Sequence, residues 1–311
     1  EIIEPKGKTS KVLIIGSGPA GLEAALACSN RGYDVTLTEA SKILGGRVAK
    51  ERKLPGLSAW GRVADYREYQ LSQKPNVETY LESSLNADQV LEFGFENVCI
   101  ATGSTWRADG VSRQHVVPIV NDNSINLYTP DDIMNDKLPT GKVVIYDDDH
   151  YYMGGVIAEK LIEKGCDVTL LTPCAYVSEW SINTLEQAEI QKRLIEMGVE
   201  IELNRGLVAI SNSKLISNCT YTQNEKEIET DNLVMVASRK PQDQLYKDLL
   251  LKKTEWIDAG ITSVKLIGDA NAPGPIAWAT YAGHRYAREL DTEEIGDALP
   301  FRREIANLSK Y

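Results

Sequence analysis

The feature that most constrains the fold is a strand-sized apolar run that leads directly into a glycine-rich turn. Residues 11–15, Lys-Val-Leu-Ile-Ile, are typical of a strand buried on both faces of a parallel sheet. Residues 16–21 follow as Gly-Ser-Gly-Pro-Ala-Gly, and the Ala- and Leu-rich segment 22–30 has good helix propensity. A second apolar run at 34–38 ends at Glu39, so the sequence predicts a strand–turn–helix–strand unit.

The three glycines of the turn have the G-x-G-x-x-G spacing that is typical of dinucleotide-binding domains. Gly16 permits the sharp turn, Gly18 lets a pyrophosphate approach the backbone, and Gly21 lets the helix pack close to the strand. The N-terminus of the helix offers free N–H groups and a partial positive charge to phosphates. Glu39, 18 residues beyond Gly21, is placed to accept from ribose hydroxyls and would repel a 2′-phosphate. We therefore predict a nucleotide site rather than a purely structural turn.

Three further signals follow in order along the chain. They are the glycine pair 45–46, a strand that ends in Ala101-Thr102-Gly103, and a strand that ends in Gly268-Asp269 before an Ala-rich helix at 276–290. Together and in this order they resemble the flavoproteins with two dinucleotide-binding domains, such as glutathione reductase and its relatives. The resemblance implies that Asp269 holds the ribityl chain of FAD.

A chain of 311 residues has room for roughly two domains. The expected fold class is α/β, with two Rossmann-like three-layer domains, the second inserted in the first. The resemblance implies a discontinuous nucleotide-binding domain, 8–117 plus 257–311, and an inserted domain, 118–256. The residues expected to contact the nucleotide are Gly16, Gly18, Pro19, Ala20, Gly21, Glu39, Ala40, Gly46, Arg47, Ala101, Thr102, Gly103, Gly268 and Asp269.

The inserted domain has the same predicted order of strand, loop, helix and strand, but its loop lacks the glycine spacing. A strand at 142–145, a helix at 156–164 and a strand at 167–171 surround a loop with three aspartates at 147–149. Each carboxylate would repel a phosphate charge by about 1 kcal/mol at ~4 Å in water and by more near a protein. We expect this domain to have lost NAD(P)H binding and interpret the run as a solvated acidic loop. A divalent metal held by the aspartates is the alternative.

Two other stretches of the inserted domain have patterns that predict secondary structure. Residues 181–197 predict an amphipathic helix with Ile190, Leu194 and Met197 on one face. The polar alternation at 211–231 predicts hairpin strands.

Composition excludes several classes of function. A net charge of −11 argues against nucleic acid, and the longest apolar runs are far shorter than the ~18 residues of a membrane helix. The five cysteines form no C-x-x-C and no zinc-ligand spacing, which predicts reduced, mostly buried thiols and a cytoplasmic protein. His115, His150 and His284 are assigned no catalytic role.

Short motifs along nearly the whole chain resemble one branch of these flavoproteins. This branch is the C-terminal half of the trimethylamine dehydrogenase family, with dimethylamine and histamine dehydrogenases and, more distantly, 2,4-dienoyl-CoA reductase. The motifs lie at 45–47, 54–60, 65–68, 101–106, 109–110, 152–153, 158–161, 266–273, 283–285 and 287–289.

In that family the other half is a TIM barrel of the old-yellow-enzyme type, which carries FMN, a [4Fe-4S] cluster and the amine-oxidising site. A barrel needs about 250 residues, and the 311 residues are already accounted for. We therefore expect a piece of a longer protein whose own N-terminal barrel half is absent. The resemblance implies ADP in the first site and a degenerate second site. FAD stays open, because both ligands share the pyrophosphate and adenosine contacts.

Three tryptophans, Trp60, Trp106 and Trp278, lie in segments that border the flavin pocket of the superfamily. They would plug that pocket or stack on a ring. Arg47 departs from the His or Gln that is more usual after the glycine pair, and its guanidinium could reach a phosphate. Arg62 stands where trimethylamine dehydrogenase has a Tyr on the face toward an electron-transferring flavoprotein. The resemblance thus implies an electron-transferring flavoprotein as a partner and a parent protein that is a homo-oligomer. It does not imply the same contact with that partner, because Arg62 replaces the Tyr.

Three functions compete. The chain is the nucleotide-binding half of an amine-dehydrogenase-like iron–sulfur flavoprotein oxidoreductase, with amine oxidation in the absent barrel and electrons passed to an external acceptor. Alternatively, it is a stand-alone FAD-dependent NAD(P)H reductase, which requires a working second fingerprint. The third alternative is a non-catalytic adenine-nucleotide-binding module.

Overall fold

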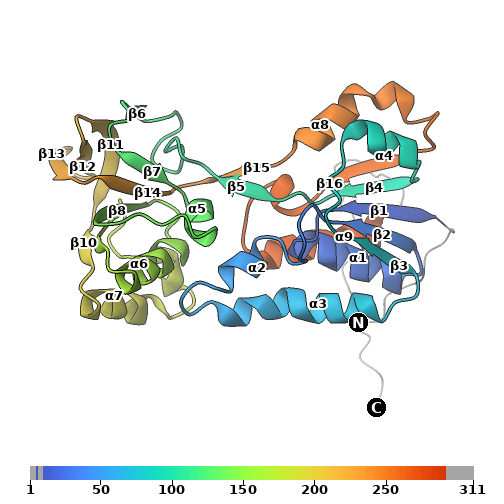
Figure 1. The fold of residues 1–311 in the computed structure, drawn as a ribbon, viewed down its shortest axis with the longest axis horizontal. Helices are drawn as coiled ribbons and strands as arrows, with labels where there is room; N and C mark the ends of the chain where they lie inside the picture. The colour runs from blue at the N-terminus through green and yellow to red at the C-terminus, as the bar shows by residue number, and fades with distance from the viewer. Residues whose placement is uncertain (1–4, 6–9, 292–311) are drawn as a thin grey trace, which may run out of the picture. The chain divides into compact units, whose positions relative to one another are not determined.

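The structure is a computed structural model that describes residue 5 and residues 10–291 (Figure 1). It divides into two compact units, which we describe separately. The described residues of the first unit fall within 1–49, 62–103 and 241–311, and the second unit comprises 50–61 and 104–240.

This division departs from the expected domain boundaries. The main segment of the second unit begins at Ser104 rather than at 118 and ends at Lys240 rather than at 256. Residues 50–61, expected in the nucleotide-binding domain, also fall in the second unit. Strands β5 (Ser104–Trp106) and β15 (Arg239–Pro241) pair with each other where the chain leaves the first unit and returns. The segment after β15 belongs to the first unit because Leu249 and Trp256 are buried in the same core as Leu13.

The first unit is a five-stranded parallel sheet with helices on both faces (Figure 1). Side chains of β1 alternate between two cores, as a strand buried on both faces requires. Val12 and Ile14 pack in a core with α1 and α9, whereas Leu13 and Ile15 pack in a core with α4. The strand order is β16-β4-β1-β2-β3. The elements are β1 (Lys11–Ile15), α1 (Pro19–Asn30), β2 (Asp34–Thr38), α3 (Arg62–Ser72), β3 (Val77–Tyr80), α4 (Ala87–Phe93), β4 (Asn97–Ile100), α8 (Gln244–Leu251), β16 (Ser263–Leu266) and α9 (Ile276–Glu289).

The second unit also has three layers, but only one of its outer layers is helical. A parallel sheet, β10-β9-β8-β14-β7, is covered on one face by α5, α6 and α7. Its other face packs on strands β11, β12 and β13, where Leu207 and Leu215 share a core with Val144 and Leu233. The elements are β6 (Val120–Asn121), β7 (Asn126–Tyr128), α5 (Pro130–Met134), β8 (Lys142–Asp147), α6 (Met153–Glu163), β9 (Asp167–Leu171), α7 (Gln187–Glu196), β10 (Glu200–Glu202), β11 (Arg205–Ser211), β12 (Lys214–Cys219), β13 (Glu225–Glu229) and β14 (Asn232–Val236).

These layers confirm the predicted α/β class and its Rossmann-like parallel sheets. The predicted hairpins are present as β11, β12 and β13, which pair antiparallel in the order of the sequence.

The helix predicted over 181–197 is wrong in its first part. A short 3₁₀ turn, Glu179–Ile182, is followed by a bend in which Leu185 has a φ of 64°, and α7 begins only at Gln187. A left-handed residue cannot continue an α-helix, so the apolar periodicity is helical only from Gln187 onward.

The acidic loop after β8 is buried, and its predicted solvation is wrong. The Asp147 and Asp148 side chains have no exposed surface. Oδ1 of Asp147 accepts from the backbone N–H groups of Asp149 (3.2 Å) and His150 (3.0 Å). Among the described residues, no donor reaches the buried Oδ2 of Asp147. Burial and the charge of Asp149 raise the pKa of the Asp147 carboxyl to about 7, although the two N–H donors act against this rise.

The neighbouring carboxyl of Asp148 has a polar atom near each of its oxygens. One oxygen lies 2.9 Å from Nε2 of His150, and the other accepts from the Ser112 hydroxyl and the Gln114 N–H. Burial raises the pKa of Asp148, but these hydrogen bonds outweigh it and hold the pKa below its ordinary value. In the part of the chain that the structure describes, no cluster of three or more His, Cys, Asp or Glu side chains is placed to hold a metal ion. Asp147 and Asp148 are therefore held by the fold of the second unit.

We expect Asp147→Asn to stabilise the chain at alkaline pH. The pKa of the carboxyl is about 7 in the folded state against an ordinary value of 3.8, so the stability it contributes is fully present below about pH 4 and is lost as pH rises through 7. The loss is at most about 1.4 kcal/mol per pH unit in that window. An amide keeps the acceptor oxygen and does not ionise. The thermal midpoint of the variant should exceed that of the wild type at pH 8, and the difference should shrink toward pH 5.

Asp167→Asn is the matched control, because Asp167 is an exposed carboxyl at the start of β9. It should leave the midpoint nearly unchanged across the same pH range. A difference between Asp147→Asn and the wild type that stays constant from pH 8 to pH 5 would contradict the assignment of this proton.

Candidate functional site

The turn between β1 and α1 is shaped by two glycines that admit no side chain. Gly16 has a φ of 100°, and a Cβ there would lie 2.5 Å from the carbonyl oxygen of Ala101. A Cβ on Gly21 would lie 1.9 Å from the carbonyl oxygen of Gly16. The Gly16 N–H donates to the Thr38 carbonyl (2.8 Å), which ties the turn to the end of β2. The two glycines thus hold α1 against the carboxyl ends of β1, β2 and β4.

The N-terminus of α1 is open at the third glycine. Gly18 is the N-cap of α1, and no heavy atom lies within 4 Å of the position that its Cβ would occupy. No side chain caps the helix, and its first turn holds no acidic residue. Pro19 has no N–H, so the backbone donors that the first turn leaves without intrahelical acceptors include those of Ala20 and Gly21. This is the arrangement that binds a phosphate.

A second glycine loop closes over this turn. Gly46 has a φ of 54°, and its Cβ would lie 2.9 Å from the Gly18 Cα. The Gly45 N–H donates to the Ser17 carbonyl (3.0 Å). Arg47 follows directly, partly buried, at the entrance to α2 (Val48–Glu51). Gly46 is therefore required by backbone-to-backbone packing, and Gly45 is favoured by its φ of 103°.

Glu39 is fixed at the end of β2 by donors from two loops. Its Oε2 accepts from both the Ser17 N–H (3.0 Å) and the Ser17 hydroxyl (2.6 Å), and its Oε1 accepts from the Ser41 N–H (2.8 Å). Burial raises the pKa of the Glu39 carboxyl, but the hydrogen bonds from Ser17 and Ser41 outweigh it and hold the pKa below its ordinary value. The carboxylate is ionised at neutral pH and fixed in orientation. Ala40 follows it and is exposed.

The two later segments join the same turn. Gly268, with a φ of 60°, leaves no room for a side chain, because its Cβ would lie 2.6 Å from the Cβ of Ala20. Oδ1 of Asp269 accepts from the Gly274 N–H (3.0 Å) and so shapes the loop that leads into α9. Thr102 and Gly103 both bond to Gln242: the Thr102 hydroxyl donates to its carbonyl (2.5 Å), and the Gly103 carbonyl accepts from its N–H (2.9 Å).

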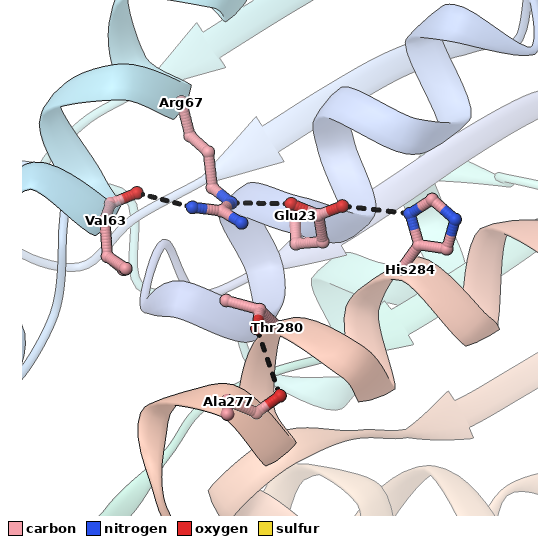
Figure 2. A network of polar contacts seen from close by, with 6 residues as sticks. All are labelled: Glu23, Val63, Arg67, Ala277, Thr280 and His284. Atoms are coloured by element: carbon pink, nitrogen blue, oxygen red, sulfur yellow. Dashed lines mark hydrogen bonds and ion pairs between the residues drawn. The ribbon is translucent and has the colours of Figure 1, made fainter. Parts of the chain in front are cut away.

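A polar network holds α1 between α3 and α9 (Figure 2). Oε2 of Glu23 accepts from Nε of Arg67 on α3 (2.6 Å), and its Oε1 lies 3.0 Å from Nδ1 of His284 on α9. Close by, a Cβ on Gly283 would lie 2.2 Å from the Ala20 carbonyl oxygen, so α9 packs on α1 through its backbone. The structure thus connects most of the predicted glycines, Ala20, Ala101 and Glu39 by direct contact.

Sequence reasoning missed Ser17, Glu23 and Gly283. A glycine inside a helix costs about 1 kcal/mol of stability relative to alanine, so Gly283 in the predicted helix indicated close packing.

Of the three tryptophans, Trp278 on α9 is 67 % exposed, and Trp106 is buried in the core of the second unit. Trp60 packs edge-on against Tyr152, with ring centroids 5.3 Å apart.

The corresponding turn of the second unit is filled by its own side chain. A Cβ on Gly154 would lie 2.4 Å from Oδ2 of Asp147, so this carboxyl lies against the first turn of α6. In the first unit, by contrast, open space lies beside Gly18, the N-cap of α1. Among the described residues of these two turns, the start of α1 is thus open, whereas a carboxyl of the chain lies against the start of α6. Within the described residues, no helix is both long enough and apolar enough to cross a membrane.

The chain is similar to a known protein family and to curated proteins. Residues 10–267 match the family described as pyridine nucleotide-disulphide oxidoreductase. Dimethylamine dehydrogenase of Hyphomicrobium sp. is 35 % identical over 98 % of this chain and 45 % of its own length.

Two solved structures are similar in sequence and fold. Histamine dehydrogenase from Rhizobium sp. 4-9 is 60 % identical with a TM-score of 0.95, and the match covers all of this chain and 48 % of that one. An amine oxidase of Pseudomonas geniculata N1 that acts on 6-hydroxypseudooxynicotine is 40 % identical with a TM-score of 0.89, over 94 % of this chain and 43 % of that one.

The chain thus spans a little under half the length of these relatives. Its resemblance to the trimethylamine dehydrogenase-like flavoproteins is confirmed. The chain belongs to the pyridine nucleotide-disulphide oxidoreductase family, and its relatives there are flavin-dependent amine dehydrogenases.

Proposed function

We propose that this chain is the nucleotide-binding half of an amine-oxidising flavoprotein and that it holds an ADP group, as ADP itself or as part of FAD. The observation that carries the proposal is the uncapped N-terminus of α1 with open space at Gly18, together with the fixed carboxylate of Glu39. The N–H groups of Ala20 and Gly21 would hold the pyrophosphate. Glu39 would accept from the adenosine ribose.

The names of the relatives support a proposal for the chemistry of the parent protein. Their names describe amine dehydrogenases and an amine oxidase, and this chain covers less than half of each. We place FMN, a [4Fe-4S] cluster and amine oxidation in a barrel half beyond this chain. Electrons would pass to an external acceptor such as an electron-transferring flavoprotein, and the parent would be a homo-oligomer. The five free cysteines fit a cytoplasmic protein.

The stand-alone NAD(P)H reductase is disfavoured by the second unit. Asp147 lies against the α6 N-terminus, where a pyrophosphate would need to bind. We expect NADH and NADPH to produce no saturable change in the intrinsic fluorescence of the chain. ADP, titrated into protein freed of bound nucleotide, is the positive control. Saturable NADH or NADPH binding that survives an excess of ADP would favour the reductase.

The ligand itself is identified by the visible absorbance of the purified chain and mass analysis of whatever acid releases. We expect an adenine nucleotide at close to one per chain. A colourless protein that releases ADP would assign a structural role to the site. Flavin bands with released FAD would bring a redox centre into this half. A chain that neither retains nor binds either ligand would overturn the proposal.

Gly18→Asp should abolish nucleotide binding. The backbone of Gly18, with a φ of −65° and a ψ of 178°, suits any residue, and the space around its Cβ is open, so the variant should fold. A carboxylate about 4 Å from a phosphate costs about 4 kcal/mol near a protein surface, which predicts a loss of affinity of at least about 100-fold. Isothermal titration with ADP measures it.

Gly18→Asn is the matched control, because it adds the same volume without the charge. We expect it to weaken ADP binding much less than Gly18→Asp does. Equal affinities for the aspartate and asparagine variants would show that no phosphate lies beside Gly18.

A further inference from the structure

The carboxylate of Glu39 has most of its acceptor capacity filled by the protein. A carboxylate has about four lone-pair positions. The Ser17 N–H and hydroxyl both donate to Oε2, and the Ser41 N–H donates to Oε1. Three of these roughly four positions are therefore taken, and Oε1 has room for one more donor.

Ser17 provides two of these three donors and is itself fully buried. The terminal torsion of a glutamate is broad, so an unsupported carboxylate rotates. With donors on both oxygens, rotation of the Glu39 carboxylate breaks at least one charge-assisted hydrogen bond, and these are the stronger kind. The remaining position on Oε1 is held in one direction before any ligand arrives.

We propose that Ser17 is a positioning residue that fixes the Glu39 carboxylate for the 2′-hydroxyl of an adenosine ribose. It thereby sets the preference of the site for a ribose whose 2′-hydroxyl is present and unsubstituted. The inference rests on the proposed function, because it assumes that an ADP group is the ligand. It assigns to Ser17 no contact with the ligand through its side chain.

Ser41, the other serine that donates to Glu39, has a different role. The Ser41 N–H donates to Oε1, whereas its hydroxyl donates to the Ile43 carbonyl (2.7 Å). A backbone donor persists in any substitution except proline, so Ser17→Ala removes a side-chain donor to Glu39, whereas Ser41→Ala would leave the Ser41 N–H donor in place. The Ser41 hydroxyl, which donates to Ile43, also lowers the pKa of the Glu39 carboxyl, but by less than the Ser17 hydroxyl does.

The test compares two ligands that differ by one atom. Affinities for ADP and 2′-deoxy-ADP are measured by isothermal titration on protein freed of nucleotide by dialysis. We expect the wild type to prefer ADP by about tenfold or more, since a hydrogen bond to a charged group is worth that much. Ser17→Ala should weaken ADP several-fold and leave 2′-deoxy-ADP nearly unchanged, so that the preference shrinks. Glu39→Ala should remove the preference.

Ser29→Ala is the matched control. Ser29 is also a buried serine of the first unit, and its hydroxyl donates to Oδ1 of Asn76 (2.9 Å) at the far end of α1. A loss of stability alone would lower both affinities by one factor, and we expect Ser29→Ala to do no more than that. Adenosine 2′,5′-bisphosphate should bind the wild type more weakly than AMP, which has the same 5′-monophosphate, because its 2′-phosphate faces the carboxylate.

The outcomes separate the two proposals. If the wild type binds neither ADP nor FAD, the proposed function fails. If the wild type binds ADP, the positioning role of Ser17 is overturned by a Ser17→Ala variant that keeps the wild-type preference, or that weakens ADP and 2′-deoxy-ADP equally. It is also overturned if the wild type binds both ligands alike.

Discussion

The first unit depends on a turn in which backbone segments lie so close together that no side chain fits between them. A Cβ on Gly21 would lie 1.9 Å from one carbonyl oxygen, and a Cβ on Gly16 would lie 2.5 Å from another. Because of this approach, the N-terminus of α1 stands at the carboxyl ends of the strands. Every other part of the site, from the Glu39 carboxylate to the loop at Gly268, is placed against that turn.

Both units contain the same order of strand, turn, helix and strand, but they differ at the start of the helix. In the first unit open space lies beside Gly18, the N-cap of the helix, and Glu39 is ionised and held by Ser17. In the second unit the carboxyl of Asp147 lies against Gly154 in the first turn of the helix, and burial raises its pKa to about 7. A helix N-terminus favours a negative charge. The second unit supplies that charge from its own chain, whereas we propose that a ligand supplies it in the first.

The glycine turn, the α/β class and the family were predictable because runs of adjacent residues carry the strand–turn–helix–strand pattern and the motifs. The burial of the acidic loop was not, since it depends on Ser112 and Gln114, more than 30 residues upstream of Asp148. Polarity alone marks 147–149 as solvent-exposed, and only tertiary partners reverse that. The start of α7 was missed for a related reason: the apolar period runs through a bend that Leu185 creates. The hydrogen bonds between Ser17 and Glu39 also join positions 22 residues apart.

The site also joins two parts of the chain that are far apart in sequence. Ala20 contacts Gly268 and Gly283 through spaces too small for a side chain, and Glu23 bonds His284, 261 residues away. A nucleotide held at the start of α1 therefore binds a surface that exists only when the first and last segments of the discontinuous unit are assembled. A ligand that binds only the folded state stabilises it in proportion to the logarithm of its concentration over Kd. An adenine nucleotide would thus strengthen this half of the protein even without electron transfer, which is why the chemical identity of the ligand, and not its presence, separates a redox role from a structural one.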